Sequence, residues 1–106
     1  MDWVYLLIAA VLEVGWALGI KFTDGFTKLV PSVLTIVGML FSFFFLSIAL
    51  RTIPIGTAYA IWTGLGAAGV AIVGILYLNE SASLVRIISI ALILCGIVGL
   101  KLGYYQ

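Results

Sequence analysis

Five residues in this sequence combine the chemical groups that a binding site for an organic cation requires. Glu13 supplies a carboxylate, Ser42 and Tyr59 supply hydroxyls, and Trp16 and Trp62 supply indole rings. A carboxylate neutralises a cation, hydroxyls orient it, and the face of an aromatic ring attracts it through the ring quadrupole. The set indicates a cation site, provided that the chain brings these residues to a common depth.

Glu13 is the most informative of these residues because it interrupts an apolar stretch over residues 3–20. That stretch is long enough to cross a bilayer as a helix, and Glu13 lies about 15 Å along it from Trp3, roughly at the midplane. A lone carboxylate there costs several kcal/mol unless it is protonated, paired or hydrated. We therefore interpret Glu13 as a residue for transport of protons, cations or both. The alternative is a structural carboxyl bonded to a neighbouring helix.

The composition predicts an all-α integral membrane protein. Of 106 residues, 65% are hydrophobic and 8% are charged, more apolar surface than a soluble domain of this size can bury. Four spans are expected within one domain, 1–106, at about 3–20, 30–50, 55–78 and 84–103. The turn pair Asp24-Gly25 separates the first two spans, and Pro31 suits the start of the second.

The composition also excludes several classes of function. A net charge of +1 with scattered basic residues argues against nucleic acid as a partner. The absence of His and the single Cys95 argue against a metal site and an internal disulfide, and no cofactor is expected. No nucleophile–base pair, metal cluster or phosphate loop is recognisable, so an enzyme is not expected.

The helical rise places the candidate residues of three spans at comparable depth. Trp62 lies about 10 Å along the third span from Ile55, and Ser42 lies about 12 Å from Leu50 at the same end of the membrane. Residues three apart share a helix face, which applies both to Glu13 with Trp16 and to Tyr59 with Trp62. The sequence therefore predicts one shared site.

Several of these residues also have a simpler interpretation. Tyr59 and Trp62 could be an ordinary packed aromatic pair, and Ser42 could donate to a carbonyl of its own helix. The aromatic residues at the chain ends are expected to anchor the protein at the membrane interface, namely Trp3, Tyr104 and Tyr105.

The basic residues are divided almost evenly between the two sides of the membrane, so they hardly favour one orientation of the chain over the other. With four spans, Arg51 and Lys101 share one side with the N-terminus, whereas Lys21, Lys28 and Arg86 lie on the other. One topology could be weakly favoured. The alternative, which we prefer, is that both orientations insert and pair as an antiparallel homodimer. Such a dimer supplies the inverted symmetry on which many transporters depend for alternating access.

Small residues in the third and fourth spans have a mechanical interpretation. Gly64 and Gly66 loosen the third helix and predict a hinge, although small residues also serve close helix packing. The fourth span has small residues at intervals of four, which predicts a dimerising surface: Ala91, Cys95, Gly99 and Gly103.

Taken together, these segments resemble the small multidrug resistance family over essentially the whole chain. The similarity includes residues 21–29 with Pro31-Ser32, and it is most specific over residues 54–66, PIGTAYAIWTGLG. The run over residues 13–17, EVGWA, together with Lys101 is similar to the guanidinium-exporter subtype. In the drug-exporting subtype, the position of Trp16 is typically a glycine.

The resemblance implies proton-coupled export through an antiparallel dimer in the cytoplasmic membrane of a prokaryote. It implies that Glu13 binds substrate and proton, that Ser42 and Trp16 support the glutamate, and that Tyr59 and Trp62 line the site. Gly64 and Gly66 match a kink in the third span. The fourth span matches the dimerising helix, with Gly96 included. Ser89 departs from the drug exporters, which often have glycine there.

The sequence thus favours a proton-coupled antiporter for guanidinium, with protons and substrate competing for Glu13 of both subunits. The first alternative is an exporter of quaternary ammonium or aromatic cations, although Trp16 beside Glu13 narrows the site. The second alternative is a pore-forming or assembly protein. A water-filled channel is disfavoured because Glu13 is the only charge at depth.

Overall fold

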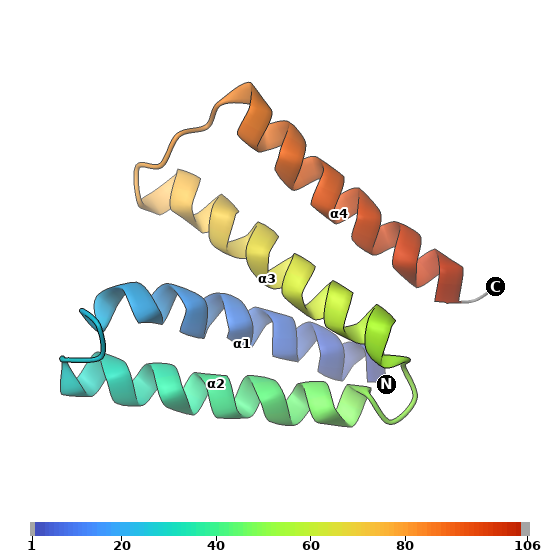
Figure 1. The fold of residues 1–106 in the computed structure, drawn as a ribbon, viewed down its shortest axis with the longest axis horizontal. Helices are drawn as coiled ribbons and strands as arrows, with labels where there is room; N and C mark the ends of the chain where they lie inside the picture. The colour runs from blue at the N-terminus through green and yellow to red at the C-terminus, as the bar shows by residue number, and fades with distance from the viewer. Residues whose placement is uncertain (1, 105–106) are drawn as a thin grey trace.

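The structure is a computed structural model, which describes residues 2–104 and contains four α-helices in that range. They are α1 (Asp2–Phe22), α2 (Leu29–Ala49), α3 (Ile55–Tyr77) and α4 (Leu84–Tyr104). Each is long and apolar enough to cross a membrane, and the four helices agree with the predicted ranges to within a few residues. Successive helices run in opposite directions, so both ends of the described chain lie at the same end of the molecule (Figure 1). Tyr105 lies outside the described residues.

The interior of the protein is formed around α1, which packs against both α2 and α3 (Figure 1). The buried apolar cluster contains residues of α1, α2 and α3 and one residue of the α2–α3 connection, and half of them are alanines: Leu6, Ala9, Ala10, Ala49, Ile53, Ala58, Ile61 and Trp62. Small residues on α1 let the neighbouring helices approach closely, as is common in membrane bundles. This three-helix layer contains all the candidate site residues.

Helix α4 differs from the other three because it packs mainly on α3 and, within the described residues, contributes no buried residue. At Gly64 of α3, an added Cβ would lie 3.1 Å from Cδ1 of Ile97, so α4 approaches α3 closely there. The rest of its surface is exposed in the single chain, which suits contact with lipid or another protein.

A tight turn joins α1 to α2, as the sequence predicts. Gly25 has a φ of 71°, and Asp24 and Phe26 also have positive φ angles, of 50° and 64°. The buried Thr23 holds the turn together: its hydroxyl donates to the Ile20 carbonyl at 2.7 Å and accepts from the Phe26 amide at 3.1 Å. Pro31 lies in the first turn of α2, where a missing amide proton costs little.

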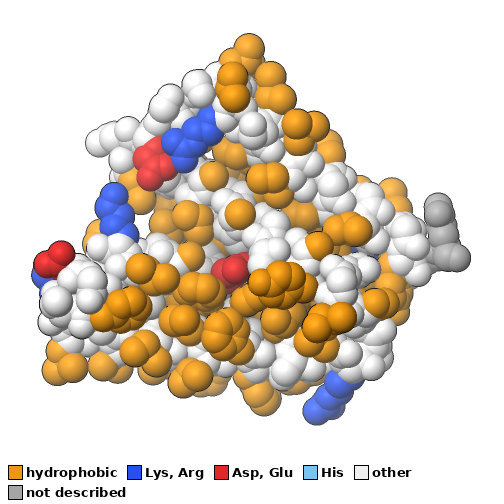
Figure 2. Space-filling model, in the orientation of Figure 1, with side chains coloured by type: hydrophobic (Ala, Val, Ile, Leu, Met, Phe, Trp, Pro, Cys, Tyr) orange, Lys and Arg blue, Asp and Glu red, His pale blue; other side chains and the backbone are white. Residues whose placement is uncertain are grey.

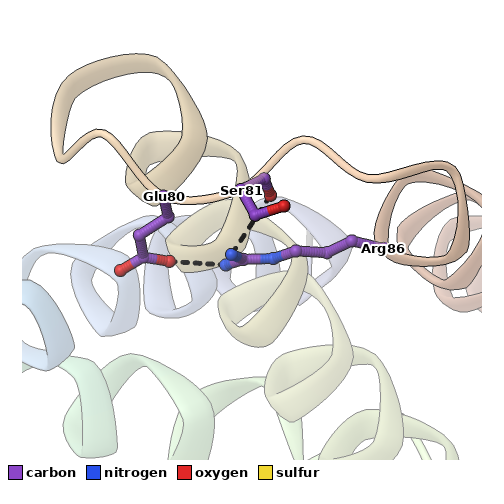
Figure 3. A network of polar contacts seen from close by, with 3 residues as sticks. All are labelled: Glu80, Ser81 and Arg86. Carbon is purple, nitrogen blue, oxygen red and sulfur yellow. Dashed lines mark hydrogen bonds and ion pairs between the residues drawn. The ribbon is translucent and has the colours of Figure 1, made fainter.

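The connection between α3 and α4 is held by an ion pair and by hydrogen bonds (Figure 3). Arg86 Nη2 lies 2.5 Å from Glu80 Oε1, and Arg86 Nη1 donates to the Ser81 carbonyl at 3.3 Å. The Glu80 amide donates to the Gly74 carbonyl at 3.1 Å, which ends α3. These contacts fix where α4 begins relative to α3.

The opposite end of the molecule joins the start of α1 to the end of α4. Trp3 and Tyr104 stack edge to face with ring centroids 5.3 Å apart, and Lys101 Nζ lies 5.1 Å from the centroid of the Trp3 ring. Thr52 donates to the Asp2 carboxylate and accepts at its carbonyl from the Tyr104 hydroxyl. The predicted aromatic anchors therefore also make contacts between helices.

Candidate functional site

Glu13 lies against α3, where its side chain occupies the space that a larger residue at position 66 would fill. A Cβ built on Gly66 would overlap Oε1 and Cδ of Glu13 and would lie 2.9 Å from Cγ. Glu13 Oε1 is buried and has no hydrogen-bond partner among residues 2–104, while the residue as a whole is partly exposed. Figure 2 shows acidic atoms in the middle of a largely apolar face, between α1 and α3. The carboxylate can therefore accept a proton or a cation.

One turn earlier on α1, the Ala9 carbonyl links three helices through a buried set of hydrogen bonds. The Ser42 hydroxyl of α2 donates to it at 2.7 Å. The Trp62 indole of α3 donates at 3.3 Å to the same carbonyl and at 3.1 Å to the Ser42 oxygen. In an α-helix this carbonyl also accepts from the amide of residue 13, so the network fixes the backbone that carries Glu13.

The bonding of Ser42 differs from its simpler interpretation, a hydrogen bond to a carbonyl of its own helix. The hydroxyl does not bond back to its own helix, because it donates across to α1. Its contact with the helix that carries Glu13 is the hydrogen bond to the Ala9 carbonyl, and its support of the glutamate stays a prediction. A serine at close helix approach can reach a neighbouring carbonyl as readily as its own, and sequence spacing does not distinguish these two acceptors.

Trp16 lies against α2, although the sequence predicts that it shares a helix face with Glu13. An added Cβ on Gly38 of α2 would lie 3.3 Å from the Trp16 Cβ, whereas Glu13 lies against Gly66 of α3. Three residues advance a helix by 300°, so the two side chains diverge by about 60° and meet different neighbours. Trp16 Nε1 is buried and has no hydrogen-bond partner in the described part of the chain.

An aromatic series connects Trp16 to the predicted aromatic pair on α3. Phe43 bridges the two indoles, with ring centroids 6.2 Å from Trp16 and 5.8 Å from Trp62. Tyr59 lies 5.7 Å from Trp62 and is 55% exposed, so its ring faces outward from the single chain. Sequence reasoning missed Phe43 because α2 carries four phenylalanines within five residues, and spacing does not single one out.

The structure thus divides the predicted site into two adjoining parts. Trp62 and Ser42 meet at the Ala9 carbonyl, with Tyr59 beside them, whereas Glu13 lies one turn further along against Gly66. Helices α1 and α3 run in the same direction (Figure 1), so one turn along α1 from Ala9 to Glu13 matches one turn along α3 from Trp62 to Gly66.

The predicted hinge residues lie on α3, and the predicted dimer residues lie on α4. Helix α3 is continuous through Gly64 and Gly66, so the hinge stays a prediction. The predicted dimer residues are all exposed on α4: Ala91, Cys95, Gly96 and Gly99. Within residues 2–104 no group of three or more metal-ligating side chains is present.

Nearly the whole chain is similar to known proteins. The model of the Small Multidrug Resistance protein family matches residues 1–93. The chain belongs to the small multidrug resistance family. A relative from Citrobacter freundii named "Guanidinium exporter" is 60% identical over 103 residues, which are 97% of this chain and 98% of the relative. A relative of the same name from Yersinia pseudotuberculosis is 57% identical, over 97% of this chain and 99% of its own length.

Family membership confirms the resemblance inferred from the sequence. With four helices that can span a membrane, it identifies this family member as a multi-pass membrane protein. The names of the relatives describe exporters rather than enzymes.

Proposed function

We propose that the protein is a proton-coupled antiporter that exports guanidinium across the cytoplasmic membrane of a prokaryote. The proposal rests mainly on Glu13 Oε1, which is buried without a hydrogen-bond partner in the described chain, about halfway along α1. An unpaired carboxylate in a poorly solvated environment is strongly stabilised by a proton or by a cation. Relatives named guanidinium exporters, at 57–60% identity, support guanidinium as that cation.

The chemistry of guanidinium suits this carboxylate. Guanidinium is a planar fork of N–H donors that can bond both oxygens of a carboxylate at once. Because a proton and guanidinium neutralise the same group, binding of one displaces the other. If the protein changes between inward- and outward-facing forms mainly when Glu13 is neutralised, this competition couples export of guanidinium to entry of protons.

The neighbouring aromatic side chains have distinct roles in this proposal. The Trp16 indole is a donor only, as guanidinium is, so its Nε1, which has no partner among the described residues, would not bond the substrate. The exposed Tyr59 ring and the adjacent Trp62 would line the site and offer ring faces to the cation.

The working unit in this proposal is an antiparallel homodimer with two Glu13 residues. Helix α4 supports it, because its residues are unburied and its small residues recur every four positions. The nearly balanced charge on the two sides of the membrane also supports insertion in both orientations.

The test of transport compares the wild-type protein with Glu13→Gln and Asp24→Asn in liposomes. Asp24 is a matched control, because it is an exposed acid in the α1–α2 turn and asparagine tolerates its positive φ. Guanidinium addition should evoke a coupled pH change in wild type and Asp24→Asn, and none in Glu13→Gln. Coupling that survives in Glu13→Gln would refute the proposal.

Two other results would identify the competing functions. A response to tetraphenylphosphonium without any response to guanidinium would indicate an exporter of aromatic or quaternary cations. Uncoupled leakage of a small neutral solute through wild-type liposomes would indicate a pore.

The dimer is tested by oxidative crosslinking at Cys95, the only cysteine of the chain, near the middle of α4. If two copies of α4 cross there in opposite directions, Cys95 meets its own copy. Gly103→Cys in a Cys95→Ala background would then be separated from its copy by about 24 Å and should not crosslink. Crosslinking at both positions would indicate a parallel pair instead.

A further inference from the structure

We infer that Gly66 is a positioning residue for Glu13, because the missing side chain at Gly66 leaves the space in which the carboxylate lies. The three heavy atoms nearest to an added Cβ on Gly66 all belong to the Glu13 side chain: Oε1, Cδ and Cγ. Gly66 is itself buried and the overlap falls on the outer atoms of the partly exposed Glu13 side chain, so an added methyl group would push the carboxylate out of this position.

The neighbouring glycine, Gly64, provides the comparison. A Cβ at Gly64 would lie 3.1 Å from Cδ1 and 3.3 Å from Cγ1 of Ile97, the flexible part of an apolar side chain on α4. That side chain can move by a few tenths of an ångström at low cost. Both glycines lie in a continuous helix, so a loss of backbone flexibility would affect the two positions alike. Only Gly66 contacts the charged group.

Close packing of α1 and α3 is a competing explanation for glycine at this position. Three residues further along α3, an added Cβ on Gly69 would lie 2.5 Å from Cγ2 of Val14, so the helices approach closely there as well. At Gly66, however, the contact is with the end of the Glu13 side chain. The space therefore sets where the carboxylate lies.

This inference rests on the proposed function in one respect, since it assigns the position of the carboxylate a consequence for guanidinium binding. With alanine at position 66, the carboxylate must leave the α1–α3 interface or the two helices must separate. In enzymes, displacing a reacting group by about 1 Å can cost on the order of 100-fold in rate, and we expect a smaller loss for a binding group. We expect Gly66→Ala to weaken guanidinium binding roughly tenfold or more, and Gly64→Ala to leave it within about twofold.

The position of the carboxylate can be observed without measuring transport. The chain contains two glutamates, Glu13 and Glu80, so labelling glutamate with ¹³C at the side-chain carboxyl gives two signals. Glu80→Gln removes one signal and assigns the other. In lipid nanodiscs, the Glu13 signal should move in Gly66→Ala and remain unchanged in Gly64→Ala. An unmoved Glu13 signal in a folded Gly66→Ala protein would overturn the inference.

A stability cycle keeps the inference testable if Gly66→Ala unfolds. In a Glu13→Ala background the three overlapping atoms are absent, so Gly66→Ala should cost much less stability there than in wild type. An equal cost in both backgrounds would overturn the inference, because the methyl group would then clash with something other than Glu13.

The two proposals can fail separately. If wild-type protein does not bind guanidinium while the carboxyl signal and the stability cycle behave as expected, the proposed function fails and the role of Gly66 stands. If wild type binds guanidinium and Gly66→Ala binds it equally well with an unmoved Glu13 signal, the role of Gly66 fails alone.

Discussion

Two polar regions lie one helical turn apart in the α1–α3 layer, and they differ in how completely their hydrogen bonds are made. Around the Ala9 carbonyl, the Ser42 hydroxyl and the Trp62 indole both have acceptors, and three helices are joined. Around Glu13, the buried Oε1 has no partner among residues 2–104. A satisfied network holds a membrane bundle in one arrangement, whereas an unsatisfied carboxylate is available to a ligand. We therefore assign a structural role to the hydrogen bonds around the Ala9 carbonyl and a ligand-binding role to Glu13.

The largest effect should come from Glu13→Gln, which tests the unsatisfied region. Coupled guanidinium exchange should fall to the background of empty liposomes, while the protein should be at least as stable as wild type, because glutamine removes an unpaired charge and Oε1 forms no hydrogen bond within the described chain that would be lost. Transport assays and unfolding in mixed detergent micelles measure the two effects. A strongly destabilised Glu13→Gln protein would show that the carboxylate is structural.

Trp62→Phe should have the next largest effect, this time on stability. It removes the donor that reaches both the Ala9 carbonyl and the Ser42 oxygen, and it leaves space where the larger ring was. We expect the free energy of unfolding to fall by about 1–2 kcal/mol, since the lost hydrogen bonds between membrane helices and the lost packing of the larger ring both contribute. Detergent unfolding monitored by circular dichroism gives the value. A stability equal to wild type would mean that the network does not hold the three helices together.

Ser42→Ala should cost less than Trp62→Phe. The Trp62 indole still reaches the Ala9 carbonyl at 3.3 Å when the Ser42 hydroxyl is absent, so no buried acceptor loses every partner. We expect about 0.5–1 kcal/mol in the same unfolding measurement. Guanidinium binding should weaken only modestly, because the hydroxyl acts on Glu13 through the backbone. A loss of binding as complete as in Glu13→Gln would indicate that Ser42 contacts the carboxylate or substrate directly.

Arg86→Gln should have the smallest effect, and it tests a polar contact outside the hydrocarbon region. The Arg86 and Glu80 side chains are 32% and 41% exposed, so solvent screens the ion pair between them. We expect about 0.5 kcal/mol or less, decreasing as salt is added. A cost larger than that of Ser42→Ala would show that the α3–α4 connection contributes more to stability than the buried network does.

Much of the fold could be predicted because the relevant signals are local. Apolar stretches near 20 residues long predict four spans, and Asp24-Gly25 predicts the turn between the first two. The segments over residues 54–66 and 13–17 indicate the family that the comparisons confirm. Position along a helix is also local, since each residue adds a fixed rise, and it places Glu13 near the middle of α1.

The partner of each side chain was decided only by the tertiary structure. The same sequence spacing would let Ser42 bond to its own helix, to Glu13 or to Ala9, and the register of α1 against α2 selects Ala9. The register of α1 against α3 places Gly66, rather than Gly64, opposite the carboxylate. These registers arise from the packing of whole helices, in which many small contacts act together, so no single residue type encodes them. The sequence by itself determined that an acid lies near the middle of the first apolar helix, and the packing determined what surrounds it.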